Sequence, residues 1–367
     1  MAQAETGKTE MGKTEMGTAD KGNADMGKPG MGTAAVAAAR DDRDGIAAFA
    51  ETARHAVAAC AALPVRERAR QLAGDGLLGI LAPESAGGLG LGPSFAAPVM
   101  EAAGAGLLGY PLAETLLLGA AFGSAPVGPA IVLGETIATI AWAGIAEGSG
   151  DRLSGTVGRA PLVDEADLLL VATRTGAALV PLDGAGVTVQ PAFGLDLETP
   201  EHEVVLTDVT PVATLDAAAT AALREDALPL WAAAIGGAAE RCLALALEHV
   251  STREQFGRTL VSFQALRHAL ARQKLAVEHV RAALERHAAL VAAGAPEARL
   301  AARTSYAAAT RFGIAAIESA LQLHGGMGFT WEVEVHRHLR RARTVEAQGD
   351  APGLHRRLAE DLLTANA

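Results

Sequence analysis

The stretch Arg253-Glu254-Gln255-Phe256-Gly257, followed by Phe263-Gln264, carries more information than a helix pattern requires. Arg253 is a permanent, fork-shaped cation that can bind a pyrophosphate. Phe256 offers a flat apolar surface, and Gln264 can both donate and accept hydrogen bonds. A charged helix end with a core aromatic is the alternative interpretation of the same residues. The stretch therefore points to a dinucleotide only if other signals agree with it.

Two glycine-rich stretches supply such signals. The first is Gln322-Leu323-His324-Gly325-Gly326-Met327-Gly328-Phe329-Thr330, and the second is Pro83-Glu84-Ser85-Ala86-Gly87-Gly88-Leu89-Gly90. Glycines allow positive φ and close backbone approach, and their exposed N–H groups can meet anionic oxygens. Helix-stopping glycines and a structural His324 are the competing interpretations. Glu84 is the weakest candidate, because an acid in a glycine loop is commonly a turn residue.

In this order and at this separation, the three stretches resemble the acyl-CoA dehydrogenase family over about residues 35–365. The resemblance implies an α+β fold with an N-terminal helical domain, a middle antiparallel β domain and a C-terminal four-helix bundle. It also implies FAD as the cofactor and an acyl-CoA thioester as the substrate. FAD in this family lies between subunits. The residues at cofactor-binding positions are Arg253, Gln255, Phe256, Gly257, Phe263, Gln264, Gln322, His324, Gly325, Gly326 and Gly328.

Composition narrows the function classes independently. The chain has 367 residues and a formal net charge of −11, so neither nucleic acid nor an anionic membrane surface is an expected partner. No apolar run approaches the ~18 residues of a membrane span, and the N-terminus is polar. Two cysteines, Cys60 and Cys242, exclude a disulfide framework and a cysteine-rich metal site. We expect a cytoplasmic protein with no metal.

The pattern along the chain divides it into four parts. Residues 1–34 repeat a polar Gly-Lys-Thr-Glu-Met unit with no apolar face, which predicts a disordered tail. Helical spacing predicts an N-terminal helical domain over 35–135, and short β-rich runs predict a middle domain over 136–215. Residues 222–367 form the predicted bundle. Its expected helices are 226–251, 262–293, 296–323, 333–342 and 352–365.

The position of the family's catalytic base is the first departure. The family usually has a Glu just before a Gly after the last arginine-rich helix, where this chain has Gln348 and Gly349. A carboxamide cannot accept a proton at neutral pH. Four carboxylates remain as weak candidates in shifted alignments: Glu346 and Asp350, and, near the family's alternative position at Ala227, Glu225 and Asp226.

The second departure lies in the β domain. Family members carry a T-E-P-x-x-G-S-D type loop against the flavin ring, whereas residues 141–150 are shorter and lack the threonine. Leu153-Ser154-Gly155-Thr156 still matches the family pattern, with Val157 in place of a lysine. Trp142 borders either a flavin or the core of the domain.

Both losses fall on the half of the site that a subunit uses for its own flavin, whereas the retained motifs serve a neighbour's flavin. The resemblance therefore implies the degenerate subunit of an α2β2 acyl-CoA dehydrogenase, such as those acting on steroid side chains, with a second acyl-CoA dehydrogenase subunit as partner. Three alternatives remain open. They are a self-sufficient homo-oligomeric dehydrogenase with a displaced base, a flavin monooxygenase-like relative, and a structural subunit without flavin.

Overall fold

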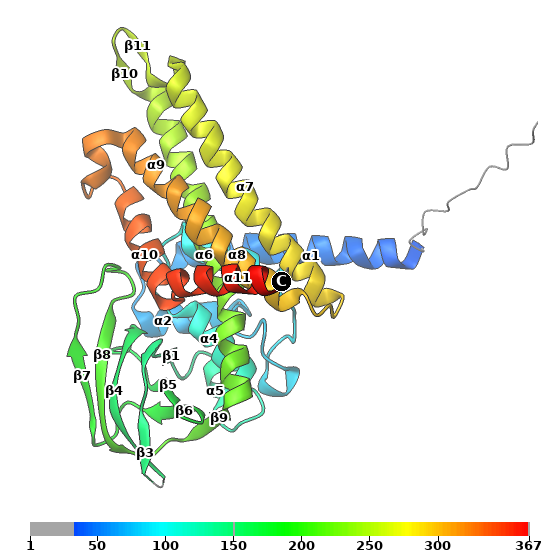
Figure 1. Cartoon of the computed structure of the whole chain (residues 1–367), viewed down its shortest axis with the longest axis vertical. Helices are drawn as coiled ribbons and strands as arrows, with labels where there is room; N and C mark the ends of the chain where they lie inside the picture. The colour runs from blue at the N-terminus through cyan, green and yellow to red at the C-terminus, as the bar shows by residue number, and fades with distance from the viewer. Residues whose placement is uncertain (1–32, 150, 366–367) are drawn as a thin grey trace, which may run out of the picture. The chain divides into compact units, whose positions relative to one another are not determined.

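The structure is a computed structural model that describes residues 33–149 and 151–365. All but the last two residues of the predicted tail, 1–34, lie outside the described residues. By its internal contacts the chain divides at Asp42, and residues 43–367 form one compact unit. Along the chain, helices come first, strands follow, and a second set of helices ends the sequence, as the colour ramp of Figure 1 shows.

The N-terminal helices enclose the first part of the main core. They are α1 (Thr33–Cys60), α2 (Val65–Gly74), α3 (Pro93–Ala105), α4 (Leu112–Phe122) and α5 (Gly128–Val132), with a short turn η1 (Glu84–Ala86). Helix α4 is apolar on nearly every side, and its residues from Leu112 to Gly119 are all buried. A helix that is hydrophobic all round belongs inside a protein. It therefore lies between the β strands and the bundle.

The strands form two main sheets and a small hairpin. Their bounds are β1 (Ala138–Ile140), β2 (Ala143–Gly144), β3 (Glu147–Ser149), β4 (Arg152–Pro161), β5 (Leu168–Thr173), β6 (Gly176–Pro181), β7 (Val187–Pro191), β8 (Glu201–Val209) and β9 (Ala213–Asp216). One sheet has the order β1-β5-β6-β9, and the other has β2-β4-β8-β7 with β3 beside β4. Pairing is antiparallel as predicted, except that β1 and β5 are parallel. Strands β2 to β4 make the crossover that a helix usually supplies.

Alternation along β5 explains how its sheet is covered on both faces. Leu168 and Leu170 belong to the main core with the helices, whereas Leu169 and Val171 belong to a second core between the two sheets. Successive side chains of a strand point to opposite faces. The uninterrupted apolar run at 168–171 is therefore the sequence mark of a strand buried on both sides.

The C-terminal helices form the predicted bundle (Figure 1). They are α6 (Ala217–Thr252), α7 (Gln264–Ala292), α8 (Ala298–Ala308), α9 (Ile314–His324), α10 (Val335–Gln348) and α11 (Ala351–Ala365), with a π-helical turn (Ala309–Gly313) joining α8 to α9. Helix α6 starts earlier than the expected residue 226, because Asp216 caps it by accepting a hydrogen bond from the Ala219 N–H at 2.7 Å.

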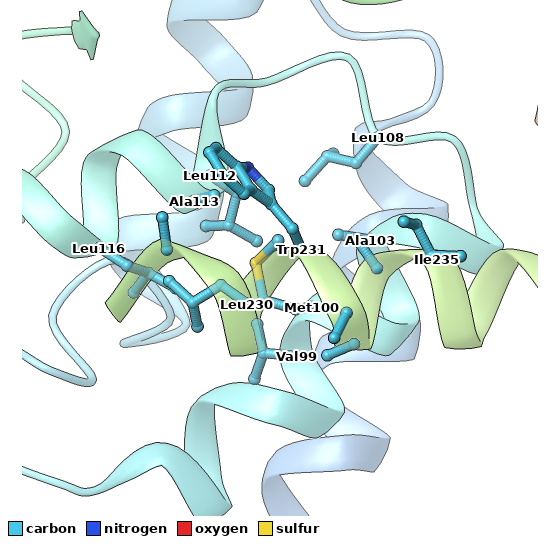
Figure 2. Close-up of a cluster of buried hydrophobic side chains, with 14 of the residues drawn as sticks. Val99, Met100, Ala103, Leu108, Leu112, Ala113, Leu116, Leu230, Trp231 and Ile235 are labelled. Atoms are coloured by element: carbon cyan, nitrogen blue, oxygen red, sulfur yellow. The ribbon is translucent and has the colours of Figure 1, made fainter. Parts of the chain in front are cut away.

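Helix α6 is the central element of the unit. By length and composition it is apolar enough to span a membrane, but 61% of its most apolar window is buried inside the protein. Figure 2 shows Trp231 and Leu230 of α6 among side chains of α3 and α4. Helices α3 and α6 approach closely at two glycines, because a Cβ at Gly104 would lie 1.9 Å from the Ala234 carbonyl oxygen and a Cβ at Gly237 would lie 2.0 Å from that of Glu101.

These contacts generate a stability prediction. Gly237→Ala forces α3 and α6 apart, so we expect it to lower the free energy of unfolding by about 3 kcal/mol, although alanine favours helix more than glycine does. Gly74→Ala is the matched control, because a Cβ there meets nothing within 4 Å. The control should be neutral or up to about 1 kcal/mol stabilising. Urea unfolding of both variants measures the difference, and an unchanged midpoint for Gly237→Ala contradicts the prediction.

Candidate functional site

The first predicted stretch forms a protruding hairpin at the end of α6 (Figure 1). Strands β10 (Glu254–Gln255) and β11 (Arg258–Thr259) pair antiparallel around Phe256 and Gly257. Both turn residues have positive φ, +55° and +76°, as a two-residue hairpin turn requires. Glycine meets this requirement without strain, which explains Gly257 locally. The Phe256 ring is 91% exposed at the tip.

The flanks of the hairpin hold the other predicted residues. Arg253 ends α6, where its backbone N–H donates to the His249 carbonyl at 2.9 Å, and its side chain is exposed. Phe263 lies edge-on to Phe256, with ring centroids 6.2 Å apart, and the Arg258 guanidinium lies 4.0 Å from the Phe263 ring centroid. Gln255 and Gln264 are exposed. The hairpin thus presents a cation, an aromatic face and amide groups outward.

The second stretch ends α9 and lies beside the end of α6. The stacked rings of His249, in the last turn of α6, and His324, the last residue of α9, have centroids 4.7 Å apart. His324 is buried and its Nδ1 lies 2.8 Å from the Ala320 carbonyl oxygen. Burial, with the nearby charge of His324, lowers the pKa of His249. The histidine pair therefore brings two stretches far apart in sequence to one end of the bundle.

The glycines of this second turn (η4, Gly325–Phe329) fall into two kinds. Gly325 has φ +60° and, like its exposed neighbour Gly326, has open space where a Cβ would be. At Gly328 a Cβ would lie 2.8 Å from the Leu321 carbonyl oxygen, so that glycine serves packing. Gln322 is exposed beside them. The Gly325 N–H donates to the Gln322 carbonyl and ends α9. Gly326 therefore leaves its backbone accessible to a ligand, and Gly328 has a structural explanation.

The third stretch has a structural explanation throughout. A Cβ at Gly88 would lie 2.3 Å from the Ala82 carbonyl oxygen, and Gly87 adopts φ +79° after the short η1 turn. The Gly90 N–H donates to Ala82 at 2.8 Å. Glu84 is exposed. This stretch closes a tight loop.

Gln348 lies at the end of α10 and is buried. Its Nε2 donates a hydrogen bond of 2.8 Å to Oε1 of Glu201, at the start of β8. Burial raises the pKa of Glu201, and the Gln348 hydrogen bond opposes that shift. The next residue, Gly349, cannot carry a side chain, because a Cβ would lie 2.4 Å from the Tyr306 hydroxyl oxygen. That hydroxyl donates to the Val345 carbonyl at 2.9 Å, which fixes the end of the helix.

The cavity beside Gln348 is small. It measures about 70 Å³, against roughly 300–1,000 Å³ for ordinary ligand pockets. Trp231 of α6 lines it, and Trp142 packs edge-on against that ring with centroids 4.5 Å apart. Trp142 Nε1 donates to Glu114 at 2.9 Å, and burial raises the pKa of that carboxyl. Trp142 is thus a buried residue that supports the cavity wall through Trp231.

A buried ion pair occupies the same cavity wall. Nε of Arg341 lies 2.6 Å from Oδ2 of Asp196, and Nη1 of Arg341 donates to the Leu108 carbonyl at 2.8 Å. Burial by itself would raise the pKa of Asp196. The charge and hydrogen bonds of Arg341, with hydrogen bonds from the Thr199 hydroxyl and the Glu198 N–H, outweigh it, and the pKa lies below its ordinary value. One turn away, Arg337 pairs with Glu198. Helix α10 thereby holds the loop before β8.

None of the four candidate bases lines this cavity. Glu346 pairs with Arg343 at 2.6 Å. Asp350 accepts a hydrogen bond from the Gly353 N–H at 3.2 Å, and Glu225 makes several hydrogen bonds to Arg303. Asp226 lines a different cleft.

Sequence reasoning missed the acids that are at the cavity. Glu114 and Asp196 line it, and Glu201 bonds Gln348. The sequence does mark Glu114, because it is a lone carboxylate in an otherwise apolar helix. Such a residue is rarely buried without a polar partner, so its position indicates a buried polar site. The sequence does not mark Asp196 and Glu201, since their positions depend on how the loop and strand meet α10. Among the described residues, no three His, Cys, Asp or Glu side chains cluster as metal ligands.

Comparisons with known proteins agree with this fold. The family model for the acyl-CoA dehydrogenase C-terminal domain matches residues 217–353. Acyl-CoA dehydrogenase FadE27 of Mycobacterium tuberculosis is 31% identical over 336 residues, covering 81% of this chain and 88% of FadE27. Acyl-CoA dehydrogenase FadE34 of the same organism is 30% identical over 287 residues, which cover 75% of this chain and only 39% of FadE34.

A solved structure has the same fold as this chain. The ChsE4–ChsE5 complex from Mycobacterium tuberculosis superposes with a TM-score of 0.76 and 29% identity, covering 87% of this chain and 97% of the matched chain. Both have the same fold, in which helices are followed by strands and then by a second set of helices. The chain belongs to the acyl-CoA dehydrogenase family, as its sequence motifs predicted.

The buried ion pair generates the second prediction. Arg341→Met leaves Asp196 buried without its cation, so we expect a loss of about 3–5 kcal/mol in the free energy of unfolding. Arg343→Met is the matched control on the same helix. Its half-exposed pairs with Glu318 and Glu346 should contribute less than about 1 kcal/mol.

The pH dependence of this stability loss tests whether the unpaired charge of Asp196 causes it. A lowered carboxyl pKa stabilises the fold above the unfolded value of about 4, and that stability is lost as pH falls through the folded pKa. Without Arg341, burial raises the pKa of Asp196, so the variant gains relative stability as the carboxyl protonates. The difference in unfolding free energy between Arg341→Met and wild type should therefore narrow as the pH falls toward about 4 and below. An equal loss in both variants, or a gap that widens with acid, contradicts this account.

Proposed function

We propose that this chain takes part in FAD-dependent α,β-dehydrogenation of an acyl-CoA thioester as the subunit that completes a partner's FAD site. One observation carries the proposal. The position of the family's base holds Gln348, bonded to Glu201 beside a cavity of about 70 Å³, while the hairpin and glycine turn at the other end of the bundle stand open. The partner is a second acyl-CoA dehydrogenase subunit.

The Gln348 side does not fit a cofactor or an acyl chain. Trp231 and the Arg341–Asp196 pair fill the space between α6, α10 and the strands. A buried pair that also satisfies the Leu108 carbonyl cannot open without leaving charges unpaired, which costs several kcal/mol. The residues around Gln348 therefore have a structural role within the chain.

The hairpin side does fit a dinucleotide. Arg253 is a cation suited to a pyrophosphate, and Phe256 is an exposed aromatic surface of the kind that an adenine or ribose covers. The exposed backbone at Gly326 adds an N–H donor for anionic oxygens. When bound, FAD would accept the hydride from the β carbon of the substrate. In this arrangement the partner supplies the carboxylate that removes the α proton.

One observation favours a second candidate function. Glu201 places a carboxylate with a raised pKa next to Gln348, so a self-sufficient dehydrogenase would have a base near the expected position. Its use would require the small cavity to open. Under this alternative, Glu201→Gln abolishes acyl-CoA oxidation by the chain alone. Under our proposal, the chain alone has no such activity to lose.

Co-expression with a complete acyl-CoA dehydrogenase subunit encoded in the same genome tests the proposal. We expect a stable complex with about one FAD per pair of chains, since each pair has one complete site. Arg253→Ala should weaken FAD retention by the complex about tenfold or more, because charge-assisted hydrogen bonds contribute about 1.5–3 kcal/mol. Arg286→Ala, at an exposed position of α7 away from the hairpin, is the matched control. A fully flavinated, active oligomer of this chain alone would overturn the proposal.

A single substitution tests the filled cavity directly. Gln348→Glu restores the family's carboxylate, yet we expect the chain alone to remain inactive toward acyl-CoA, because the cavity stays too small for a flavin and a thioester. The variant should instead lose stability as pH rises, since two carboxylates beside each other share a proton and resist full ionisation. Acyl-CoA-dependent dye reduction and urea unfolding at two pH values measure both effects. Dye reduction by the variant would contradict the prediction.

A further inference from the structure

A second cleft lies on another face of α6. It measures about 440 Å³, within the range of ordinary small-molecule sites, and α4, α6 and α7 supply most of its lining. It shares no lining residue with the cavity at Gln348. Along α6, Leu230 faces this cleft and the adjacent Trp231 faces the cavity. The two spaces are therefore separate.

Small side chains make the room in this cleft. Four alanines line it, two from the end of α4 and two from the start of α6: Ala120, Ala121, Ala219 and Ala222. Three of them, all but Ala222, are exposed, and leucines from the same helices complete the apolar walls. An apolar wall left open to solvent on this scale favours a ligand that removes it from water.

Two polar side chains in the lining define what such a ligand must offer. His287 of α7 is buried, and its Nδ1 lies 3.1 Å from the Ala298 carbonyl oxygen, so Nδ1 carries the proton and donates. Burial lowers the pKa of His287, which keeps the ring neutral and leaves Nε2 as an acceptor. Within the described part of the chain, Nε2 has no hydrogen-bond partner. Asp226 of α6 contributes a carboxylate, which is also an acceptor.

The surroundings of Asp226 narrow the chemistry of the ligand further. Burial raises the pKa of the Asp226 carboxyl, and the nearby charge of Arg299 opposes that shift only in part. Both facing groups accept hydrogen bonds, so the complementary group on the ligand is a hydrogen-bond donor such as a hydroxyl.

We propose that the cleft between α4, α6 and α7 binds an apolar molecule that carries a hydroxyl group, with the hydroxyl directed at Asp226 and His287. The walls bury the apolar body, and the hydroxyl satisfies acceptors that the fold leaves free. This site is independent of the proposed function, because it uses neither the hairpin nor the Gln348 cavity.

Fluorenol and fluorenone test the proposal, since these rigid polycyclic molecules differ only in a hydroxyl against a ketone. By isothermal titration calorimetry with the full chain, fluorenol should bind with one-to-one stoichiometry, and fluorenone should bind about tenfold more weakly or worse, because its oxygen can only accept. Equal affinities, or no measurable binding of fluorenol, would overturn the proposal.

Variants locate the binding in this cleft. Ala121→Trp fills the space and should abolish fluorenol binding, whereas Ala289→Trp, at an exposed position of α7 outside the cleft, should leave it unchanged. Asp226→Asn introduces an amide donor, so the preference for the hydroxyl over the ketone should shrink. If Ala121→Trp fails to fold, Asp226→Asn, at an exposed position, still tests the proposal. Unchanged discrimination by Asp226→Asn would refute the assignment.

Discussion

The buried ion pair between Arg341 and Asp196 is the interaction on which the rest of the site depends. Its 2.6 Å contact joins α10 to the loop before β8, and the bond from Arg341 to the Leu108 carbonyl adds the N-terminal helices. Three parts of the chain therefore meet at one guanidinium. A single buried charge pair gives little net stability. Its effect is geometric, because each part must take one position for the charges to stay paired.

That geometry explains why the two ends of the bundle differ. Next to the ion pair, Gln348 reaches Glu201, and Trp231, backed by Trp142, leaves only a small cavity. At the other end, the histidine stack of His249 and His324 aligns two turns but leaves their outer surfaces bare. One end satisfies its polar groups internally. The other presents a cation, an aromatic ring and open backbone to whatever lies outside the chain.

The fold was largely predictable from local patterns, because helix periodicity and apolar strand runs depend on near neighbours. The expected helix over 262–293 became α7, Gln264–Ala292, and the run at 168–171 became a strand buried on both faces. The site was less predictable. Gln348 could be placed by comparison with a family motif, but its partner Glu201 depends on strand register, with Pro161 opposite Glu201 across β4 and β8. No short-range pattern encodes that pairing. The parallel pairing of β1 with β5 was not predicted for the same reason.

Helix α6 shows how an alanine-rich sequence can serve several sites at once. Gly237 lets α3 approach on one face, Trp231 closes the Gln348 cavity on another, and Asp226 stands in the open cleft. These uses need side chains of different volume at successive positions. An alanine-rich helix permits this, because one large or missing side chain changes only its own face. The chain has only three tryptophans. One of them, Trp231, lines the cavity, and a second, Trp142, packs against it. The cavity wall and its support therefore use two of the three largest side chains in a sequence where aromatic residues are scarce.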